Sequence, residues 1–155
     1  MSQKETFEPL YNGGFHVKTL GQIKSELVDA FPLSQTRLIL FNKFSLFLDH
    51  LINKLHVKPD TIWIDGSYTT VKENPADIDI LVVFDKDSAN AMSQNNQKDL
   101  KQLIANKGFS SLYSCDVYWV SKGDQEMMSY WRGWYGFDRK DNAKGIIKLT
   151  MEEPV

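Results

Sequence analysis

Two short polar motifs in the middle of the chain carry the residues best suited to chemistry. Gly66 and Ser67 end one apolar run, and Asp77 and Asp79 begin another. Residues i and i+2 of a strand share a face, roughly 6–7 Å apart, so the two aspartates should point the same way. Paired carboxylates repel each other, and a cation that prefers oxygen ligands, Mg²⁺ or Mn²⁺, relieves the repulsion. The N–H groups of a Gly-Ser turn can bind phosphate. Together the motifs predict a metal–nucleotide site.

A third aspartate, Asp116, interrupts the apolar residues 112–120, which we expect to form a strand. If this strand lies beside the strand at 77–84, Asp116 can face the same site. Three carboxylates on two neighbouring strands can hold two divalent ions, which bind the attacking and leaving oxygens in phosphoryl transfer. Asp116 would then also be the general base for an incoming hydroxyl.

The composition of the whole chain is that of an ordinary folded domain. It has 155 residues, 42% hydrophobic and 25% charged, and we expect a single domain spanning 1–155. The net charge of −2 argues against a protein that holds long duplex nucleic acid through phosphate contacts alone. The single Cys115 suits a reducing compartment, and no apolar run is long enough to span a membrane. The polar N-terminus has no secretory signal, so we expect a cytoplasmic protein.

The hydrophobic pattern predicts an α/β (α+β) fold, in which a small mixed sheet is backed by helices. Residues 1–18 read as an irregular N-terminal arm. Thr19 heads a capping box, and Ser34 and Ser88 are expected to cap two longer helices, the second closed by Gly108. The expected helices are 19–31, 34–55, 89–107 and about 125–132, and the expected strands are 61–64, 77–84, 112–120 and 145–150.

The Gly-Ser and Asp-x-Asp motifs with a later aspartate resemble the nucleotidyltransferase superfamily, whose fold is shared with DNA polymerase beta. More narrowly, most of the chain resembles a bacterial family of small nucleotidyltransferase-like proteins, through residues 13–16, 61–70, 74–79, 134–139 and 144–147. The resemblance implies that Gly66 and Ser67 hold the triphosphate of a nucleotide. It also implies that Asp77 and Asp79 bind metal and that Asp116 is the third acid.

Several other residues allow two alternative roles each. Asp65 can be a ligand, although capping the turn is the favoured role. Three basic residues of the tail can neutralise a triphosphate, and solvated surface charge is an equally good reading of each: Arg132, Arg139 and Lys144. The aromatic residues of the tail favour packing over stacking on a base: Trp131, Trp134 and Tyr135.

The expected activity is Mg²⁺- or Mn²⁺-dependent transfer of a nucleotidyl group from a nucleoside triphosphate, with ATP as one candidate. The acceptor is a hydroxyl of a protein or of RNA, in a toxin–antitoxin or phage-defence setting where a cognate toxin or antitoxin is a partner. The alternative is a degenerate module of the same fold that binds nucleotide or a partner without turnover. The segment 68–70 favours the alternative, because Tyr-Thr-Thr stands where the superfamily usually carries an arginine- and glycine-bearing turn. A purely structural interpretation is that the aspartate pair forms the solvated face of an edge strand.

Overall fold

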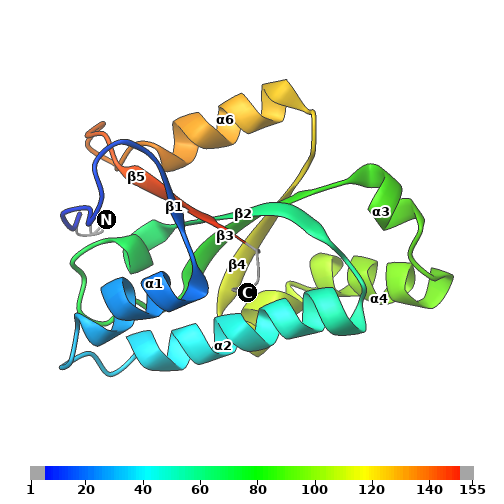
Figure 1. Ribbon diagram of the computed structural model, residues 1–155, viewed down its shortest axis with the longest axis horizontal. Helices are drawn as coiled ribbons and strands as arrows, with labels where there is room; N and C mark the ends of the chain where they lie inside the picture. The colour runs from blue at the N-terminus through cyan, green and yellow to red at the C-terminus, as the bar shows by residue number, and fades with distance from the viewer. Residues whose placement is uncertain (1–5, 151–155) are drawn as a thin grey trace.

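The computed structural model describes residues 6–150 and contains a five-stranded mixed sheet (Figure 1). The strand order is β1-β5-β2-β3-β4. The strands are β1 (Gly14–Lys18), β2 (Pro59–Asp65), β3 (Ile78–Phe84), β4 (Cys115–Ser121) and β5 (Gly145–Leu149). β1 runs parallel to β5 and β3 parallel to β4, whereas β2 is antiparallel to both of its neighbours. The predicted α+β class with a small mixed sheet is confirmed.

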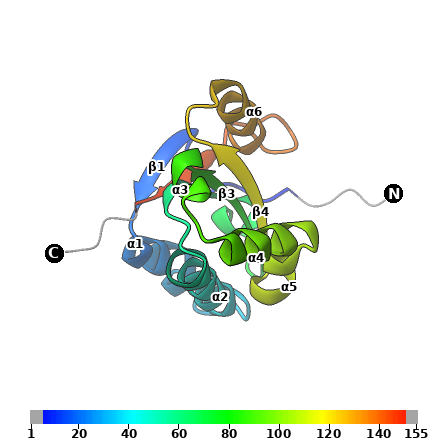
Figure 2. The same ribbon diagram turned by 90° about the vertical axis from the view of Figure 1, so that its right-hand side faces the viewer.

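Helices cover the two faces of the sheet unequally. One face carries α1, α2, α4 and α5, and the other face carries α6 (Figures 1 and 2). The α-helices are α1 (Leu20–Lys24), α2 (Arg37–Asp49), α3 (Lys86–Asn90), α4 (Gln94–Ala105), α5 (Gly108–Tyr113) and α6 (Gln125–Tyr135). Two π-helical segments, η1 (Ser25–Asp29) and η2 (His50–Lys54), extend α1 and α2, and a 3₁₀ turn, η3 (Gly66–Thr69), follows β2.

Strand alternation divides the hydrophobic core into two layers. The larger layer lies under α1, α2 and α5 and receives alternate residues of β2 and β3: Ile62, Ile64, Ile78, Ile80 and Val82. The smaller layer lies under α6. It contains intervening residues of the strands, Trp63, Leu81, Val83 and Val120, together with Ile146 of β5 and Tyr135 of α6. The residues of β2, β3 and β4 that alternate with the larger layer therefore point to the α6 side.

Several predicted elements are confirmed. Thr19 forms the expected capping box with Gln22 at the start of α1. The strands expected at 61–64, 77–84 and 145–150 correspond to β2, β3 and β5, and the last helix to α6. The helix expected at 34–55 is α2 continued by η2.

Two other expectations are wrong. The segment 89–107 is not one helix, because α3 and α4 are separate and are capped by the side chains of Asp85 and Ser93. The strand expected at 112–120 begins only at Cys115, since α5 occupies the residues before it.

The arm at 1–18 was predicted to be irregular, yet its last residues form β1 beside β5. Before β1, Pro9 forms an isolated bridge with Thr70, and Leu10 N–H donates to the carbonyl of Thr69 at 3.0 Å. The arm therefore packs along the turn that follows β2. Its residues 1–5 lie outside the described part of the chain.

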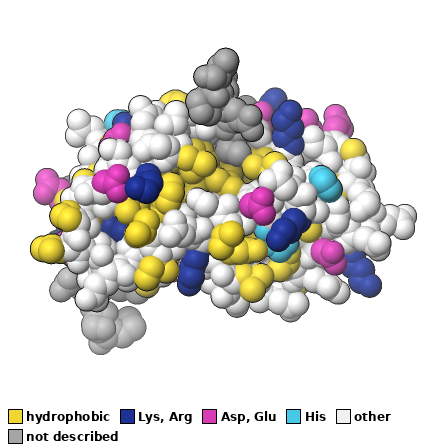
Figure 3. Space-filling view, turned by 60° about the horizontal axis from the view of Figure 1, so that its bottom comes forward, with side chains coloured by type: hydrophobic (Ala, Val, Ile, Leu, Met, Phe, Trp, Pro, Cys, Tyr) yellow, Lys and Arg dark blue, Asp and Glu magenta, His cyan; other side chains and the backbone are white. Residues whose placement is uncertain are grey.

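The face built by α1 and α2 leaves apolar side chains in solvent. Figure 3 shows hydrophobic side chains gathered in patches on this face. The exposed apolar residues of α2 and the loop before it are Leu33, Leu38, Ile39 and Leu46. Among residues 6–150, none of the helices combines the length and the apolar character needed to cross a membrane.

Candidate active site

Three aspartates on three adjacent strands lie side by side and are called the acid row: Asp65, Asp79 and Asp116. Asp65 of β2 pairs with Asp79 of β3, and Asp79 pairs with Asp116 of β4. Neighbouring strands are about 4.8 Å apart, so residues that pair across them have backbones close together. The predicted adjacency of Asp79 and Asp116 is confirmed by this pairing.

The acid row points to the α6 side of the sheet. Each of its members lies two residues from a side chain packed on that side, and alternate residues of a strand share a face. These neighbours are Trp63 for Asp65, Leu81 for Asp79 and Tyr118 for Asp116. The hydrophobic layer under α6 thus borders the row along the strands.

Asp77 lies next to the acid row but outside the sheet. It is exposed and precedes β3 by one residue. Burial, together with the charge of Asp77, raises the pKa of the neighbouring Cys115 thiol to about 12. Cys115 is buried and is a free thiol. Asp77 therefore adds a fourth carboxylate at the start of the parallel pair β3–β4.

The turn after β2 fits closely against the row because it begins with a glycine. Gly66 has φ +81°, and a Cβ placed on it would lie 2.5 Å from Asp79 Oδ2. The Gly66 N–H donates to Asp65 Oδ1 at 2.6 Å, which confirms the predicted capping role of Asp65. Ser67 follows within η3 and is half-buried. Gly66 therefore lies against Asp65 and Asp79, and Ser67 follows it in the same turn.

Lys144 reaches the same turn from the loop before β5. Its Nζ is 2.7 Å from Asp65 Oδ1 and donates to the Gly66 carbonyl at 2.8 Å. The lysine side chain is only 10% exposed. Lys144 is thus brought to the predicted site, where it serves as the counter-ion of Asp65 and as an anchor of the turn.

Asp65 is the buried member of the row. Its side chain is 4% exposed, and burial raises its pKa to about 7, against the lowering effects of Lys144 and of the Gly66 N–H. The charge of Asp79 contributes to this raised pKa. Oδ1 has two partners, whereas Oδ2 is buried and accepts no hydrogen bond. One oxygen of the row is therefore desolvated and unsatisfied.

Two tyrosines border the row from the α6 side. The Tyr118 hydroxyl donates to Asp116 Oδ2 at 3.2 Å, and its ring centroid lies 4.5 Å from that of Trp131 on α6. Burial raises the pKa of Tyr118, and the charges of all three predicted acids raise it further. Burial likewise raises the pKa of Tyr135, together with the charges of Asp79 and Asp65. The Tyr135 hydroxyl is buried without a hydrogen-bond partner.

A buried arginine holds the far side of the turn. Arg37, the first residue of α2, is 0% exposed and donates to the carbonyls of Leu27, Tyr68, Thr70 and Lys72. The Tyr68 hydroxyl donates back to the Arg37 carbonyl at 3.0 Å. The Tyr-Thr-Thr segment that departs from the superfamily pattern is therefore fixed in place by Arg37.

The other predicted nucleotide-binding residues lie farther out. Arg132 is exposed on α6, and its guanidinium donates to Ser129 Oγ at 3.4 Å. Arg139 is exposed on the loop after α6. In the tail, Trp131 and Tyr135 pack against the sheet, whereas Trp134 is 67% exposed. The packing reading is thus confirmed for Trp131 and Tyr135.

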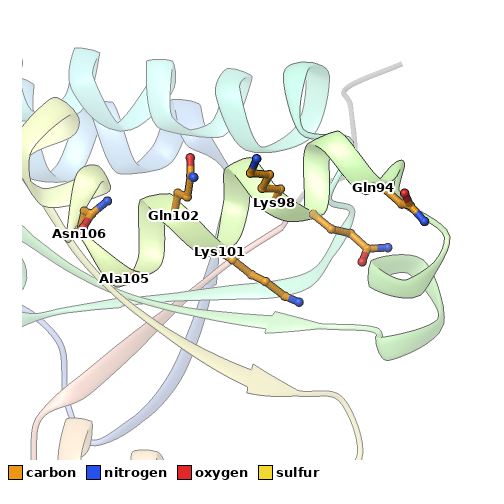
Figure 4. Close-up of a pocket in the computed structure, with 7 residues that line it drawn as sticks. Gln94, Lys98, Lys101, Gln102, Ala105 and Asn106 are labelled. Atoms are coloured by element: carbon orange, nitrogen blue, oxygen red, sulfur yellow. The ribbon is translucent and has the colours of Figure 1, made fainter.

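Two hollows of the surface lie away from the acid row. One, of about 510 Å³, runs along α4 and is lined by Lys98, Lys101 and amide side chains (Figure 4). Another, of about 640 Å³, lies at the opposite ends of β2 and β3, near Lys58 and Asp85. Within residues 6–150, no three His, Cys, Asp or Glu side chains already converge as a metal-binding group.

From the sequence, no role was assigned to Arg37 or Tyr118, and the burial of Asp65 was not predicted. Tyr118 had a usable signal, since it lies two residues from Asp116 in an expected strand and so must share its face. Arg37 offered none, because its partners are backbone carbonyls brought together by folding.

Comparison with known proteins places the chain in a family. No curated protein matches it significantly, and no solved structure does. A family model described as a family of unknown function, DUF6932, matches residues 5–150. That match includes the acid row, the Gly66 turn and Lys144, and it spans almost the whole chain. The chain therefore belongs to the DUF6932 family.

Proposed function

We propose that the chain is a Mg²⁺- or Mn²⁺-dependent nucleotidyltransferase that moves a nucleotidyl group from a nucleoside triphosphate to a hydroxyl of a protein or RNA acceptor. The observation that carries the proposal is the register of Asp79 with Asp116 on adjacent parallel strands, with the Gly66 turn against Asp79. Carboxylates beside a glycine turn are what a metal-bound triphosphate requires.

The residues present fit a divalent cation in their chemistry. The donors would be carboxylate oxygens, and the missing Cβ of Gly66 lets the Asp79 carboxylate lie directly against the turn. Asp77, Asp79 and Asp116 would hold the metal after their side chains turn toward one point. When bound, the metal neutralises charge on the triphosphate and on the leaving pyrophosphate.

The protein's own groups supply the remaining steps. The turn at Gly66 and Ser67 binds phosphate oxygens through the Ser67 N–H, because the Gly66 N–H already donates to Asp65 Oδ1. Lys144 holds that turn in place through the Gly66 carbonyl. Asp116 is exposed and accepts the proton of the attacking hydroxyl. We place the protein in the cytoplasm, with a cognate toxin or antitoxin as acceptor or partner.

A degenerate binding module is the second candidate, and a specific observation favours it. Lys144 already neutralises Asp65 and occupies the Gly66 carbonyl, while Arg37 fixes the Tyr-Thr-Thr segment. In such a module the turn is a rigid binding surface rather than a phosphate loop that adapts during turnover.

One experiment separates the two candidates. Purified protein is incubated with each α-labelled nucleoside triphosphate, Mg²⁺ or Mn²⁺ and lysate of the native host, and labelled macromolecules and released pyrophosphate are measured. The enzyme gives labelled product and pyrophosphate, and Asp116→Ala reduces both by about 10²-fold or more while nucleotide affinity changes little. Tight nucleotide binding without pyrophosphate release would establish the module instead.

A further inference from the structure

One phenol group lies at the predicted general base. The chain has six tyrosines, all within the described residues. The Tyr118 hydroxyl donates to Asp116 Oδ2 at 3.2 Å, while three other hydroxyls bond elsewhere, Tyr11 to Glu26, Tyr68 to the Arg37 carbonyl and Tyr113 to His50. Tyr135 is buried, and Tyr130 is exposed on α6.

We propose that Tyr118 is itself a nucleotidyl acceptor, so that the protein modifies its own strand β4. The inference rests on the proposed function and adds an acceptor to it. The Tyr118 Oη attacks the α-phosphorus of a nucleoside triphosphate and forms an Oη–P bond. The bond from the α-phosphorus to the oxygen bridging the β-phosphate breaks, and pyrophosphate leaves with that electron pair. The phenol proton passes to the Asp116 carboxylate. The product is a tyrosyl nucleoside monophosphate diester, and no group is oxidised or reduced.

The geometry around the phenol supports this role in four ways. The 3.2 Å separation from Asp116 Oδ2 is within the reach of a general base. Packing against Trp131, with ring centroids 4.5 Å apart, holds the phenol ring in position. Tyr118 is 37% exposed on the end strand of the sheet, so a nucleotide can reach it. The hydroxyl also shares the face of the acid row, because Tyr118 follows Asp116 by two residues.

Self-modification would limit the activity of the site. The new phosphodiester is an anion placed beside Asp116, and it replaces the O–H that donated to that carboxylate. We expect protein modified at Tyr118 to lose transfer to other acceptors, because like charge at the row opposes binding of another triphosphate.

The test follows the protein's own mass after incubation with each nucleoside triphosphate and Mn²⁺ or Mg²⁺. We expect the addition of one nucleotidyl group, which peptide mapping places on Tyr118. Tyr118→Phe should abolish the addition without lowering the melting temperature. Tyr130→Phe is the matched control, since this phenol is 57% exposed and also contacts Trp131, and it should leave the addition unchanged. Asp116→Asn should slow the addition by about 10²-fold or more.

The outcomes separate this inference from the proposed function. Metal-dependent stabilisation of the wild-type protein by a nucleoside triphosphate is measured in parallel as a binding readout. If the protein binds nucleotide and labels other acceptors while Tyr118 stays unmodified, the inference is overturned and the function stands. Label on another residue, or label that survives Tyr118→Phe, overturns it equally. If no nucleoside triphosphate binds or reacts, the proposed function fails and the inference fails with it.

Discussion

The members of the acid row share one face of the sheet but differ in exposure. Asp65 is buried and paired with Lys144, Asp79 is half-buried, and Asp116 is exposed. Because Lys144 and the Gly66 N–H hold Asp65 in place, we expect the proposed metal binding and proton transfer to involve Asp79, Asp116 and the exposed Asp77. Asp65 anchors the turn that faces them.

Neutralising either Asp77 or Asp79 should abolish binding of Mg²⁺–nucleotide without harming the fold. Wild-type protein at about a hundredfold excess of Mg²⁺–nucleotide over its Kd should gain about 2.7 kcal/mol of stability. Asp79→Asn and Asp77→Asn should lose this gain, while the melting temperature without ligand stays the same or rises because a repulsion is removed. Thermal melts with and without ligand measure both quantities. If both variants keep the full ligand-induced shift, the metal site lies elsewhere.

The buried Asp65 should make stability depend on pH near neutrality. Its pKa is raised to about 7 in the folded protein and is about 3.9 when unfolded, so folding favours the protonated form. This contribution is complete below about pH 4 and is lost as the pH rises through about 7, by at most about 1.4 kcal/mol per pH unit. Asp65→Asn lacks this dependence.

Urea unfolding from pH 5 to 8 checks this expectation. The free energy of unfolding of Asp65→Asn, minus that of the wild type, should increase across the range, because only the wild type must ionise a buried carboxylate. A difference that stays flat or falls would show that Lys144 keeps Asp65 ionised throughout.

Among the elements, the turn η3 joins the acid row to the rest of the fold. A Cβ at Gly66 would meet Asp79 Oδ2 at 2.5 Å, whereas one at Gly123, with φ +89°, would meet nothing within 4 Å. Gly123→Ala should therefore cost only the strain of a positive φ, about 1 kcal/mol, and Gly66→Ala at least about 2 kcal/mol. Chemical denaturation measures both free energies. Equal losses would mean that Asp79 moves aside at no cost.

Arg37 should determine the stability of the same turn from its other side. Arg37→Met leaves carbonyls of the turn without donors in a buried place, so we expect a loss of about 3–5 kcal/mol in the free energy of unfolding. Arg132→Met, at an exposed site, should change that free energy by less than about 0.5 kcal/mol. A small effect at Arg37 would show that water or another donor replaces the guanidinium.

The sequence predicted those parts of the site that follow from local pattern. Alternation along each strand predicted that Asp79 and Asp116 share a face if their strands are neighbours, and the structure supplies the pairing of β3 with β4. The pairing of Asp65 with Lys144 was out of reach, since Lys144 lies 78 positions beyond Gly66 and only the folded sheet joins them.

Local reading also failed where tertiary contacts select the conformation. Gly108 was expected to close a helix, but Lys107 adopts the left-handed conformation, φ 52°, and Gly108 begins α5. A Cβ at Gly108 would lie 2.6 Å from Leu103 Cδ2, so the glycine serves close packing rather than a positive φ. The short β1 was missed because it becomes a strand only beside β5, at the other end of the chain.

At the scale of the whole molecule, the last strand completes the sheet. β5 lies between β1 and β2, so the first strand reaches the rest of the sheet only through it (Figure 1). β5 also contributes Ile146 to the layer under α6 and Ile147 and Leu149 to the larger layer. A chain without β5 must leave both layers open and expose one edge of β2 along hydrophobic residues.

Two truncations should therefore have unequal effects. Removal of residues 145–155 deletes a central strand, and we expect the cooperative thermal transition to disappear. The amide and near-ultraviolet signals that mark a fixed core should be lost with it. Removal of residues 1–18 deletes an edge strand and leaves β5 paired with β2, so a cooperative transition should remain at a lower temperature. Calorimetry and circular dichroism compare the two. A cooperative transition in the chain without β5 would show that β2, β3 and β4 fold independently, and the acid row with them.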